Sequence, residues 1–321
     1  MDIFKKPLRR REFVKAIAAM GAGLPLFNSP LFAQSNAAKT KVANEKAAIK
    51  KPIPSSGELL PVVGMGSSRT FDVFDDEETN EKLLKVLQLF FDNGGSLIDS
   101  SPMYGSSEQV IGNLLKRVQN KEALFSATKV WIDGQKEGIE QMQNSMKLWG
   151  VKKFDLMQIH NLRDWEAHLE TLRQWKADGK IRYIGITTSH GRFHEELETI
   201  LETEPFDFVQ FSYNIANRDV EQRLLPIAKE KGIATLINRP FQRGSLFSNV
   251  RGKPLPDWSK EFDMESWGQF FLKFIISHPA VTCVIPATSK PRHMIDNMGA
   301  GFGKLPDLNT RKRMIEYVSS L

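Results

Sequence analysis

The sequence predicts a single (β/α)8 TIM barrel, and two observations support this prediction. From residue 57 onward, short apolar runs alternate with stretches of helical periodicity, which is typical of parallel strands joined by crossover helices. Eight such units fit within the chain of 321 residues, which is the number that closes a barrel. An open doubly wound sheet is the alternative, but its G-x-G-x-x-G motif does not follow the first predicted strand.

Each predicted strand is an apolar run that ends at polar or turn-forming residues. The predicted strands cover 62–66, 96–100, 124–130, 154–160, 182–188, 208–214, 233–239 and 282–288. The stretches between them repeat apolar residues every three or four positions, so they are predicted as helices. These helices are expected near 79–93, 106–119, 136–149, 165–178, 192–203, 221–231, 265–278 and 291–300. Residues 306–321 predict one more amphipathic helix outside the barrel, which makes 57–321 the barrel domain.

The N-terminal region has the organisation of an export signal. The basic segment around Arg10-Arg11 is followed by a Gly- and Ala-rich apolar run, and Ala33 offers a small residue for a signal peptidase. We therefore predict a twin-arginine signal peptide over residues 1–33, and a periplasmic or otherwise exported protein handled by the twin-arginine export machinery. The alternative is a basic amphipathic helix of a cytoplasmic protein. Residues 34–56 are polar and rich in lysine, which predicts a flexible linker.

The composition argues against several classes of function. The net charge is +6, but the excess of lysine and arginine lies in residues 1–51, so the predicted barrel offers no broad basic surface to nucleic acid. The single cysteine, Cys283, excludes an intramolecular disulfide, and its apolar neighbours predict a core residue. The histidines lack the spacing of metal ligands, so no metal site is expected.

Four polar residues follow or end successive predicted strands. Asp99 and Tyr104 belong to the end of the second strand and its loop, Lys129 to the third strand and His160 to the fourth. Because active sites of such barrels lie at the carboxyl ends of the strands, these side chains are expected to surround one reacting oxygen. Each has a structural explanation by itself, such as a capping aspartate or a buried histidine, but the four together favour a catalytic group.

The sequence around these residues is similar to the signature of the aldo/keto reductase family. The likeness includes Ile98-Asp99, Tyr104-Gly105-Ser106-Ser107-Glu108 and Ile111-Gly112, and it continues through Lys129 and His160 to about residue 303. This resemblance implies hydride transfer from NADPH, with NADH as the alternative, to the carbonyl of a small aldehyde or ketone. It also implies Tyr104 as the proton donor, supported by Lys129 and Asp99, with His160 orienting the substrate.

The chemistry of carbonyl reduction calls for a similar set of residues. A hydride that reaches a carbonyl carbon leaves negative charge on the oxygen, which needs a proton and preorganised hydrogen-bond donors. A free tyrosine has a pKa of about 10, and we expect the ammonium group of Lys129 to lower the pKa of Tyr104. Asp99 is expected to hold Lys129 charged and in place.

The same resemblance implies cofactor contacts at the ends of later strands. Gln210 is expected to bind the nicotinamide carboxamide, with Thr187 and Thr188 in place of the usual Ser-Asn pair. The family's Tyr-Ser-Pro is replaced by Asn238-Arg239-Pro240, which removes the aromatic ring that stacks on the nicotinamide. The stretch that contains Arg243 and Gly244 is a candidate cover for the pyrophosphate.

The segment after the eighth strand leads into a predicted helix whose N-terminus can attract an anion. We expect it to bind the adenosine 2′-phosphate, which favours NADPH. The residues assigned to this site are Thr288, Ser289, Lys290, Arg292 and Asn297. Trp131 and Trp165 are predicted walls of the substrate pocket.

Two functions follow from the sequence. The first is an NADP-dependent oxidoreductase that reduces an aldehyde or a ketone to an alcohol. The alternative is an exported cofactor-binding sensor or accessory protein with slow or closed-cycle turnover, which the missing stacking aromatic and the export signal favour.

Overall fold

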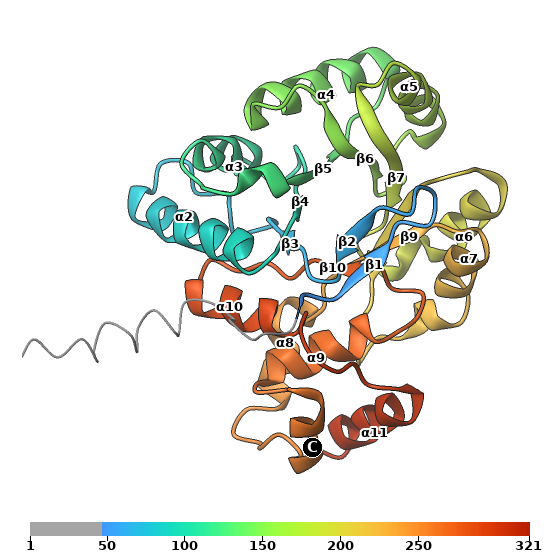
Figure 1. Ribbon diagram of the computed structural model, residues 1–321. Helices are drawn as coiled ribbons and strands as arrows, with labels where there is room; N and C mark the ends of the chain where they lie inside the picture. The colour runs from blue at the N-terminus through green and yellow to red at the C-terminus, as the bar shows by residue number, and fades with distance from the viewer. Residues whose placement is uncertain (1–46) are drawn as a thin grey trace, which may run out of the picture. The chain divides into compact units, whose positions relative to one another are not determined.

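The computed structural model describes residues 47–321 (Figure 1). The predicted signal peptide, residues 1–33, and the predicted linker up to residue 46 lie outside the described residues. Within residues 47–321, no helix has the length and apolar character needed to cross a membrane.

Eight parallel strands form the centre of the fold, as the sequence predicts. Their order in the sheet follows the order in the chain, and parallel bridges between Val63 and Val284 and between Gly66 and Ala287 join the first strand to the last. This pairing closes the sheet, so the (β/α)8 barrel is confirmed. The strands are β3 (Met65–Gly66), β4 (Leu97–Asp99), β5 (Phe125–Val130), β6 (Phe154–His160), β7 (Ile181–Thr187), β8 (Phe208–Ser212), β9 (Ala234–Asn238) and β10 (Cys283–Val284).

The first and last strands are shorter than the sequence predicts. The backbone N–H of Gly66 donates to the carbonyl oxygen of Pro286, but Pro286 has no N–H to return such a bond. The regular ladder therefore ends early at the seam of the barrel. Cys283 lies at this seam and is fully buried, which confirms it as a core residue.

Helices alternate with the strands and surround them (Figure 1). Several begin where a side chain accepts a hydrogen bond from the first turn, such as Asp76 before α2, Ser266 before α9 and Asp307 before α11. The helix after β10 packs against the helix after β3, which completes the outer ring. The helices are α2 (Glu77–Asp92), α3 (Ser107–Leu115), α4 (Gln135–Trp149), α5 (Trp165–Ala177), α6 (His194–Thr203), α7 (Leu224–Glu230), α8 (Ser245–Asn249), α9 (Trp267–Ile276), α10 (Pro291–Gly299) and α11 (Leu308–Ser319).

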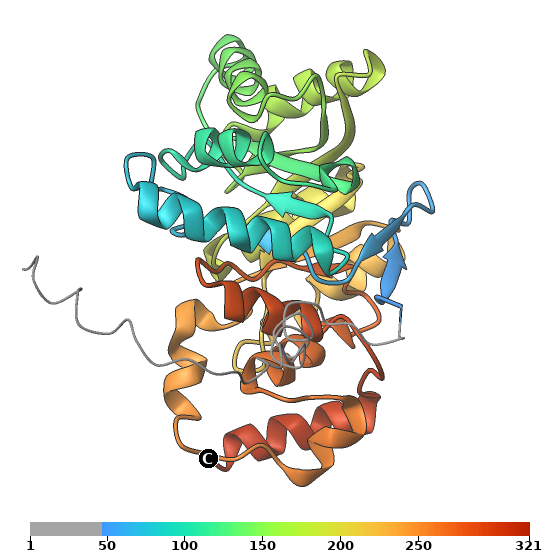
Figure 2. The same cartoon turned by 60° about the vertical axis from the view of Figure 1, so that its left-hand side comes forward.

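A hairpin of β1 (Lys50–Pro52) and β2 (Leu59–Pro61) precedes the barrel and lies beside its strands (Figure 2). Ile53 and Leu60 are buried in one apolar cluster with the first residues of several strands, among them Phe125 and Phe208. The hairpin therefore covers the amino end of the barrel. The predicted linker is wrong over residues 50–56, because this short polar segment gains its order from the strand ends that it covers.

Candidate active site

A cavity of about 890 Å³ opens at the carboxyl ends of the strands, where active sites of this architecture lie. Its volume is in the range of pockets that bind small molecules and cofactors. Many of the residues predicted for the site line this cavity. They are Asp99, Tyr104, His160, Gln210, Asn238, Arg239, Pro240, Arg243, Gly244, Thr288 and Asn297.

Lys129 and Asp99 form a buried ion pair beneath the cavity. The ammonium nitrogen of Lys129 donates to Asp99 Oδ2 at 2.6 Å and to the carbonyl oxygen of Ser100 at 2.7 Å. The Lys129 side chain is fully buried, and only 3% of the Asp99 side chain is exposed to solvent. Burial alone lowers the pKa of Lys129, but Asp99 and Tyr104 raise it more, so Lys129 remains a cation.

The register of the sheet brings these two side chains together. Asp99 is the last residue of β4 and pairs with Ala127 of β5, two positions before Lys129. Lys129 and Ala127 therefore point to the same side of the strand, which is the inside of the barrel. The two predicted charges meet because neighbouring strands end their apolar runs at the same level.

Tyr104 lies above this pair, in the loop between β4 and α3. Its ring centre is 5.3 Å from the ammonium nitrogen of Lys129 and 5.8 Å from the ring centre of His160. The planes of the two rings meet at 89°, an edge-to-face contact. The four predicted catalytic side chains therefore form one group.

A carboxylate that the sequence prediction missed holds the Tyr104 loop. Asp72 Oδ1 accepts hydrogen bonds from the backbone N–H and the hydroxyl of Ser106, both at 2.8 Å. Gly105 between them has a φ of +58°, and a Cβ at this position would lie 2.3 Å from Asp72. Because Gly105 has no Cβ, the loop that carries Tyr104 and Ser106 can close over Asp72.

Other residues of the same signature serve packing. Glu108 is buried and accepts hydrogen bonds from Thr128, Ser145 and Trp149, so it ties α3 to β5 and α4. A Cβ at Gly112 would lie 1.9 Å from the carbonyl oxygen of Leu148, so only glycine permits this contact between helices.

The environment of His160 keeps its ring neutral. Burial, together with the charge of Lys129, holds the pKa of His160 well below its ordinary value. Ser101 Oγ lies 3.0 Å from His160 Nδ1 and accepts from the backbone N–H of Met103, which leaves the hydroxyl hydrogen to donate to Nδ1. We infer that His160 carries its proton on Nε2.

Tyr104 corrects one sequence-based expectation. Burial raises the pKa of Tyr104 above its ordinary value, and this effect is larger than the lowering by Lys129. The tyrosine is therefore held in its protonated form. The expected lowering of the pKa was wrong because it considered the charge of Lys129 without the burial that accompanies it.

A chain of amides continues from Asp99 across the barrel. Asp99 Oδ1 accepts from Nε2 of Gln158 at 2.8 Å and from Nε2 of Gln210 at 3.0 Å. Gln210 Nε2 also donates to Gln158 Oε1, and Asn238 Nδ2 donates to Gln210 Oε1. The network fixes the side chains from β4 to β9 in one arrangement.

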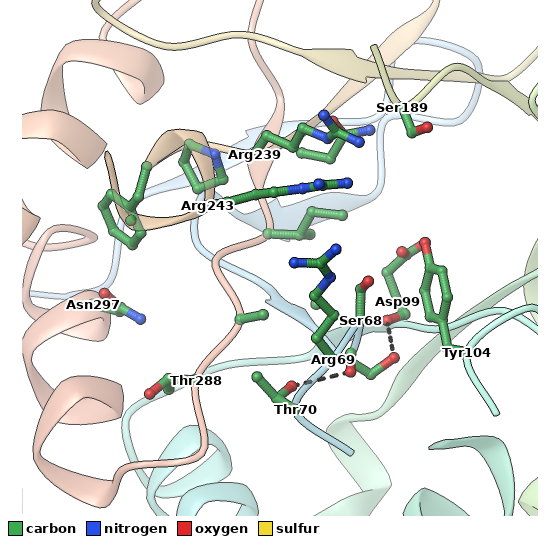
Figure 3. Close-up of a pocket in the computed structure, with 18 of the residues that line it drawn as sticks. Ser68, Arg69, Thr70, Asp99, Tyr104, Ser189, Arg239, Arg243, Thr288 and Asn297 are labelled. Carbon is green, nitrogen blue, oxygen red and sulfur yellow. Dashed lines mark hydrogen bonds between the residues drawn. The ribbon is translucent and has the colours of Figure 1, made fainter. Parts of the chain in front are cut away.

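Three arginines line the opposite side of the cavity, and the sequence prediction included two of them. Arg69 follows β3, Arg239 follows β9, and Arg243 lies in the turn before α8. Their guanidinium groups project into one shared space that faces Tyr104 (Figure 3). All three have a left-handed backbone, with φ values of 64°, 50° and 57°, which is uncommon for residues other than glycine.

The model of the aldo/keto reductase family matches residues 62–311. The chain belongs to the aldo/keto reductase family. It is therefore an oxidoreductase of that family. Among relatives, this reductase is 29% identical over 203 residues to aldo-keto reductase YhdN of Bacillus subtilis, a match that covers 59% of this chain and 58% of that protein.

Two further relatives cover more of the chain. Methylglyoxal reductase YeaE of Escherichia coli is 25% identical over 254 residues, which are 77% of this chain and 88% of that protein. The crystal structure of an aldo/keto reductase from Klebsiella pneumoniae in complex with NADP and acetate superposes with a TM-score of 0.67, at 18% identity, over 84% of this chain and 96% of that chain. The structural likeness extends over almost the whole barrel.

Of the residues predicted to contact the cofactor near β7, only some have polar atoms that are available to a ligand. Both hydrogens of the Gln210 amide already have acceptors, so only Oε1 has a lone pair left for a ligand. Thr187 and Thr188 do not line the cavity. The hydroxyl of Thr187 accepts from the backbone N–H of Asn161, whereas the buried hydroxyl of Thr188 has no partner.

The predicted phosphate site at α10 is divided in the structure. Thr288 and Asn297 line the cavity of the reductase, whereas Ser289, Lys290 and Arg292 do not. His293 and Asp296 line it in their place. The sequence predicted a helix here, which the structure confirms as α10, but it could not show which side of this helix faces the cavity.

Neither predicted tryptophan lines the cavity. The ring centre of Trp131 lies 6.4 Å from that of His160, and the guanidinium carbon of Arg163 lies over the Trp131 ring at 5.0 Å from its centre. Trp165 packs against the core at the start of α5. The walls near the mouth are instead apolar residues that the prediction did not include, Met103, Phe241 and Phe247.

No group of three or more acidic, histidine or cysteine side chains in residues 47–321 is arranged to hold a metal ion.

Proposed function

We propose that the protein reduces the carbonyl group of an aldehyde or ketone with NADPH, and that Tyr104 donates the proton. The observation that carries this proposal is the buried Asp99–Lys129 pair beneath a protonated Tyr104, beside a neutral His160. This arrangement supplies a proton and a second hydrogen-bond donor to one oxygen atom at the floor of the cavity.

The cavity fits a nicotinamide dinucleotide. It continues from Tyr104 and His160 to α10, where Thr288, just before the helix, and Asn297, in its second half, lie at the other end (Figure 3). Gln210 lines the cavity, and its Oε1, which among residues 47–321 accepts a hydrogen bond from Asn238 alone, is a polar group that such a ligand can satisfy. When bound, a reduced nicotinamide supplies the hydride.

The residues of this chain then perform the proton chemistry. Nε2–H of His160 donates a hydrogen bond to the carbonyl oxygen and orients it. As negative charge develops on that oxygen, the hydroxyl of Tyr104 transfers its proton. Lys129 stabilises the resulting phenolate, and Asp99 keeps Lys129 in position, so the charge that leaves Tyr104 remains compensated.

Lys290 and Arg292 support NADPH as the preferred cofactor. Both are exposed cations at the start of α10, beside Thr288 and at the end of the cavity away from Tyr104. A 2′-phosphate that reaches past the cavity wall meets these cations and the helix N-terminus. Asp296, which faces the cavity, accepts hydrogen bonds from Ser266 and Gln269.

The experiment that tests this function is a titration of the purified protein with NADPH and NADH, followed by absorbance measurements of cofactor oxidation with small aldehydes and ketones. We expect tighter binding of NADPH and multiple turnovers. Tight binding without turnover would contradict the reductase function and favour the sensor that the sequence leaves open.

We further propose that the protein is exported by the twin-arginine pathway. The support is the ordered basic, apolar and small-residue regions of residues 1–33. Replacing Arg10 and Arg11 by lysine should retain the protein in the cytoplasm, which fractionation and immunoblotting would reveal. Equal distribution of the variant and the natural protein would contradict export by this route.

A further inference from the structure

We infer that Ser101 is a positioning residue that makes the cavity selective for a carbonyl group over an alcohol. Ser101 acts through His160, whose hydrogen-bonding state it fixes. This inference rests on the proposed function, because it specifies how the oxygen atom of the ligand is recognised. Its basis is the set of hydrogen bonds that one buried serine makes with the two groups beside the reacting oxygen.

The first step is the direction of the hydrogen bond between Ser101 and His160. Ser101 is fully buried, and its Oγ lies 3.0 Å from His160 Nδ1 and 3.2 Å from the backbone nitrogen of Met103. The N–H of Met103 can only donate, so Oγ accepts from it and keeps its own hydrogen for another acceptor. Within residues 47–321, Nδ1 is the only acceptor in reach of this hydrogen, so Ser101 donates and Nδ1 accepts.

The second step is the nitrogen of His160 that remains for a ligand. A neutral imidazole has one N–H and one lone pair, so an accepting Nδ1 places the hydrogen on Nε2. His160 lines the cavity, and its Nε2 has no hydrogen-bond partner in residues 47–321. Nε2 is also absent from the fully buried polar atoms of this part of the chain that lack a partner, so it is open to the cavity. The cavity therefore presents a hydrogen-bond donor at this point.

The third step is that this donor distinguishes a carbonyl from an alcohol. A carbonyl oxygen can only accept a hydrogen bond, whereas an alcohol can donate as well as accept. If the hydrogen of His160 moved to Nδ1, Nε2 would become an acceptor, which an alcohol can still satisfy and a carbonyl cannot. Ser101 opposes this exchange, because a donating Nδ1 would leave the Ser101 hydrogen buried without an acceptor, at a cost of about 1–3 kcal/mol.

Ser101 also holds the proposed proton donor, through its backbone. Its carbonyl oxygen accepts from the backbone N–H of Tyr104 at 3.0 Å, and the hydroxyl of Ser107 donates to the carbonyl oxygen of Tyr104 at 2.7 Å. The main chain of Ser101 therefore fixes the turn that carries Tyr104, whereas its side chain fixes the hydrogen of His160. A substitution that removes only the hydroxyl separates these two roles.

The direct test is the position of the His160 hydrogen in the full chain without ligand. Nitrogen NMR of isotope-labelled protein distinguishes protonated from unprotonated ring nitrogens, and the signals that disappear in His160→Gln assign the ring. We expect hydrogen on Nε2 in the natural protein and a mixture of both forms in Ser101→Ala. Hydrogen on Nδ1 in the natural protein, or an unchanged ring in Ser101→Ala, would overturn the inference.

The functional test compares benzaldehyde, as substrate, with benzyl alcohol, as inhibitor of its reduction by NADPH. In Ser101→Ala, we expect the KM for benzaldehyde to rise about 3- to 10-fold, which corresponds to the loss of one hydrogen bond. The inhibition constant of benzyl alcohol should change less, because the alcohol can donate to an unprotonated Nε2. The Kd for NADPH should stay the same. Equal weakening of aldehyde and alcohol would indicate a general disturbance of the fold and would overturn the inference.

Two further variants serve as controls. Ser101→Thr keeps the hydroxyl and should retain the natural ratio of aldehyde to alcohol binding. Ser145→Ala removes another fully buried serine hydroxyl, which donates to Glu108 outside the cavity, and should leave both the His160 hydrogen and this ratio unchanged. The same change of ratio in Ser145→Ala would overturn the inference. If the natural protein binds NADPH but reduces no small aldehyde, the proposed reductase function fails, whereas the NMR measurement still decides the role of Ser101.

Discussion

The two sides of the cavity treat charge in opposite ways. On the side of β4, β5 and β6, Asp99 and Lys129 are buried, paired at 2.6 Å and linked to a network of amides. On the side of β3 and β9, the cations Arg69 and Arg239 lie on left-handed turns and form no ion pair with an acidic side chain within residues 47–321. The first side is complete before a ligand arrives, whereas the second side needs the ligand.

This difference separates two tasks. A proton donor acts best when its surroundings are preorganised, because no reorganisation is then needed during the reaction. A binding site gains selectivity when its charges are satisfied only by the right ligand. We expect changes on the paired side to reduce the rate constant, and changes on the arginine side to alter the binding of ligands.

The substitution with the largest expected effect is Tyr104→Phe. It removes the proposed proton donor but keeps the ring that contacts His160, so kcat should fall about 10²- to 10⁴-fold. The Kd for NADPH should change little. Single-turnover absorbance and cofactor titration measure the two quantities, and an equal loss of both would show that Tyr104 acts in binding rather than in catalysis.

Lys129→Met tests whether the ion pair is part of the fold as well as of the reaction. The change leaves the Asp99 carboxylate buried without its cation, which should lower the free energy of unfolding by about 3–5 kcal/mol. Denaturant unfolding monitored by circular dichroism measures this loss. The double variant Lys129→Met with Asp99→Asn should recover part of the stability but none of the activity. A single variant as stable as the natural protein would contradict the pairing.

Asp72→Ala tests a residue that acts through the Tyr104 loop. Asp72 contacts Ser106 rather than Tyr104, so its loss should loosen the loop and lower kcat about tenfold. Asp72→Asn keeps one acceptor for Ser106 and should retain more activity. Because Asp72 lines the cavity and is only three residues after Arg69 in the chain, a change in substrate preference with an unchanged kcat would assign it to binding instead.

The pH dependence should be weak over the neutral range. Burial raises the pKa of Tyr104 above about 10, so the donor stays protonated at lower pH, and kcat for reduction should fall only as the pH rises past that raised value. His160 stays neutral at pH 6.5, since its pKa is well below its ordinary value. A profile of log kcat from pH 6 to 10 should therefore be nearly flat. An inflection between pH 6.5 and 9 would show that one of these two assignments is wrong.

The paired side could be predicted from the sequence because simple periodicity determines it. Asp99, Lys129 and His160 end apolar runs, and parallel strands bring such ends to one level. Their distances and the resulting pKa directions could not be predicted. The pKa of Tyr104 shows the reason, because burial depends on residues that are distant in sequence, and here it outweighs the nearby charge.

The arginine side could be predicted less well because it consists of turns. No local sequence pattern predicts that Arg69 adopts a left-handed conformation. Nor does any local pattern predict that Arg69 shares a space with Arg239, which follows a distant strand. Similarly, only the packing of α10 decides that Asp296 faces the cavity while Arg292 does not. Side chains on helices and turns depend on tertiary contacts, whereas the ends of barrel strands are set by the architecture.

The hairpin of β1 and β2 has a consequence for the order of events. Side chains fill the inside of the barrel, and Ile53 and Leu60 cover its amino end, so in the proposed reaction cofactor and substrate share the cavity at the carboxyl ends of the strands. In the proposed reaction, the cofactor and the carbonyl substrate would have to meet beside Tyr104 and His160 in this cavity. If both molecules pass through this one opening, the proposed reaction should be ordered, with the cofactor binding first and leaving last.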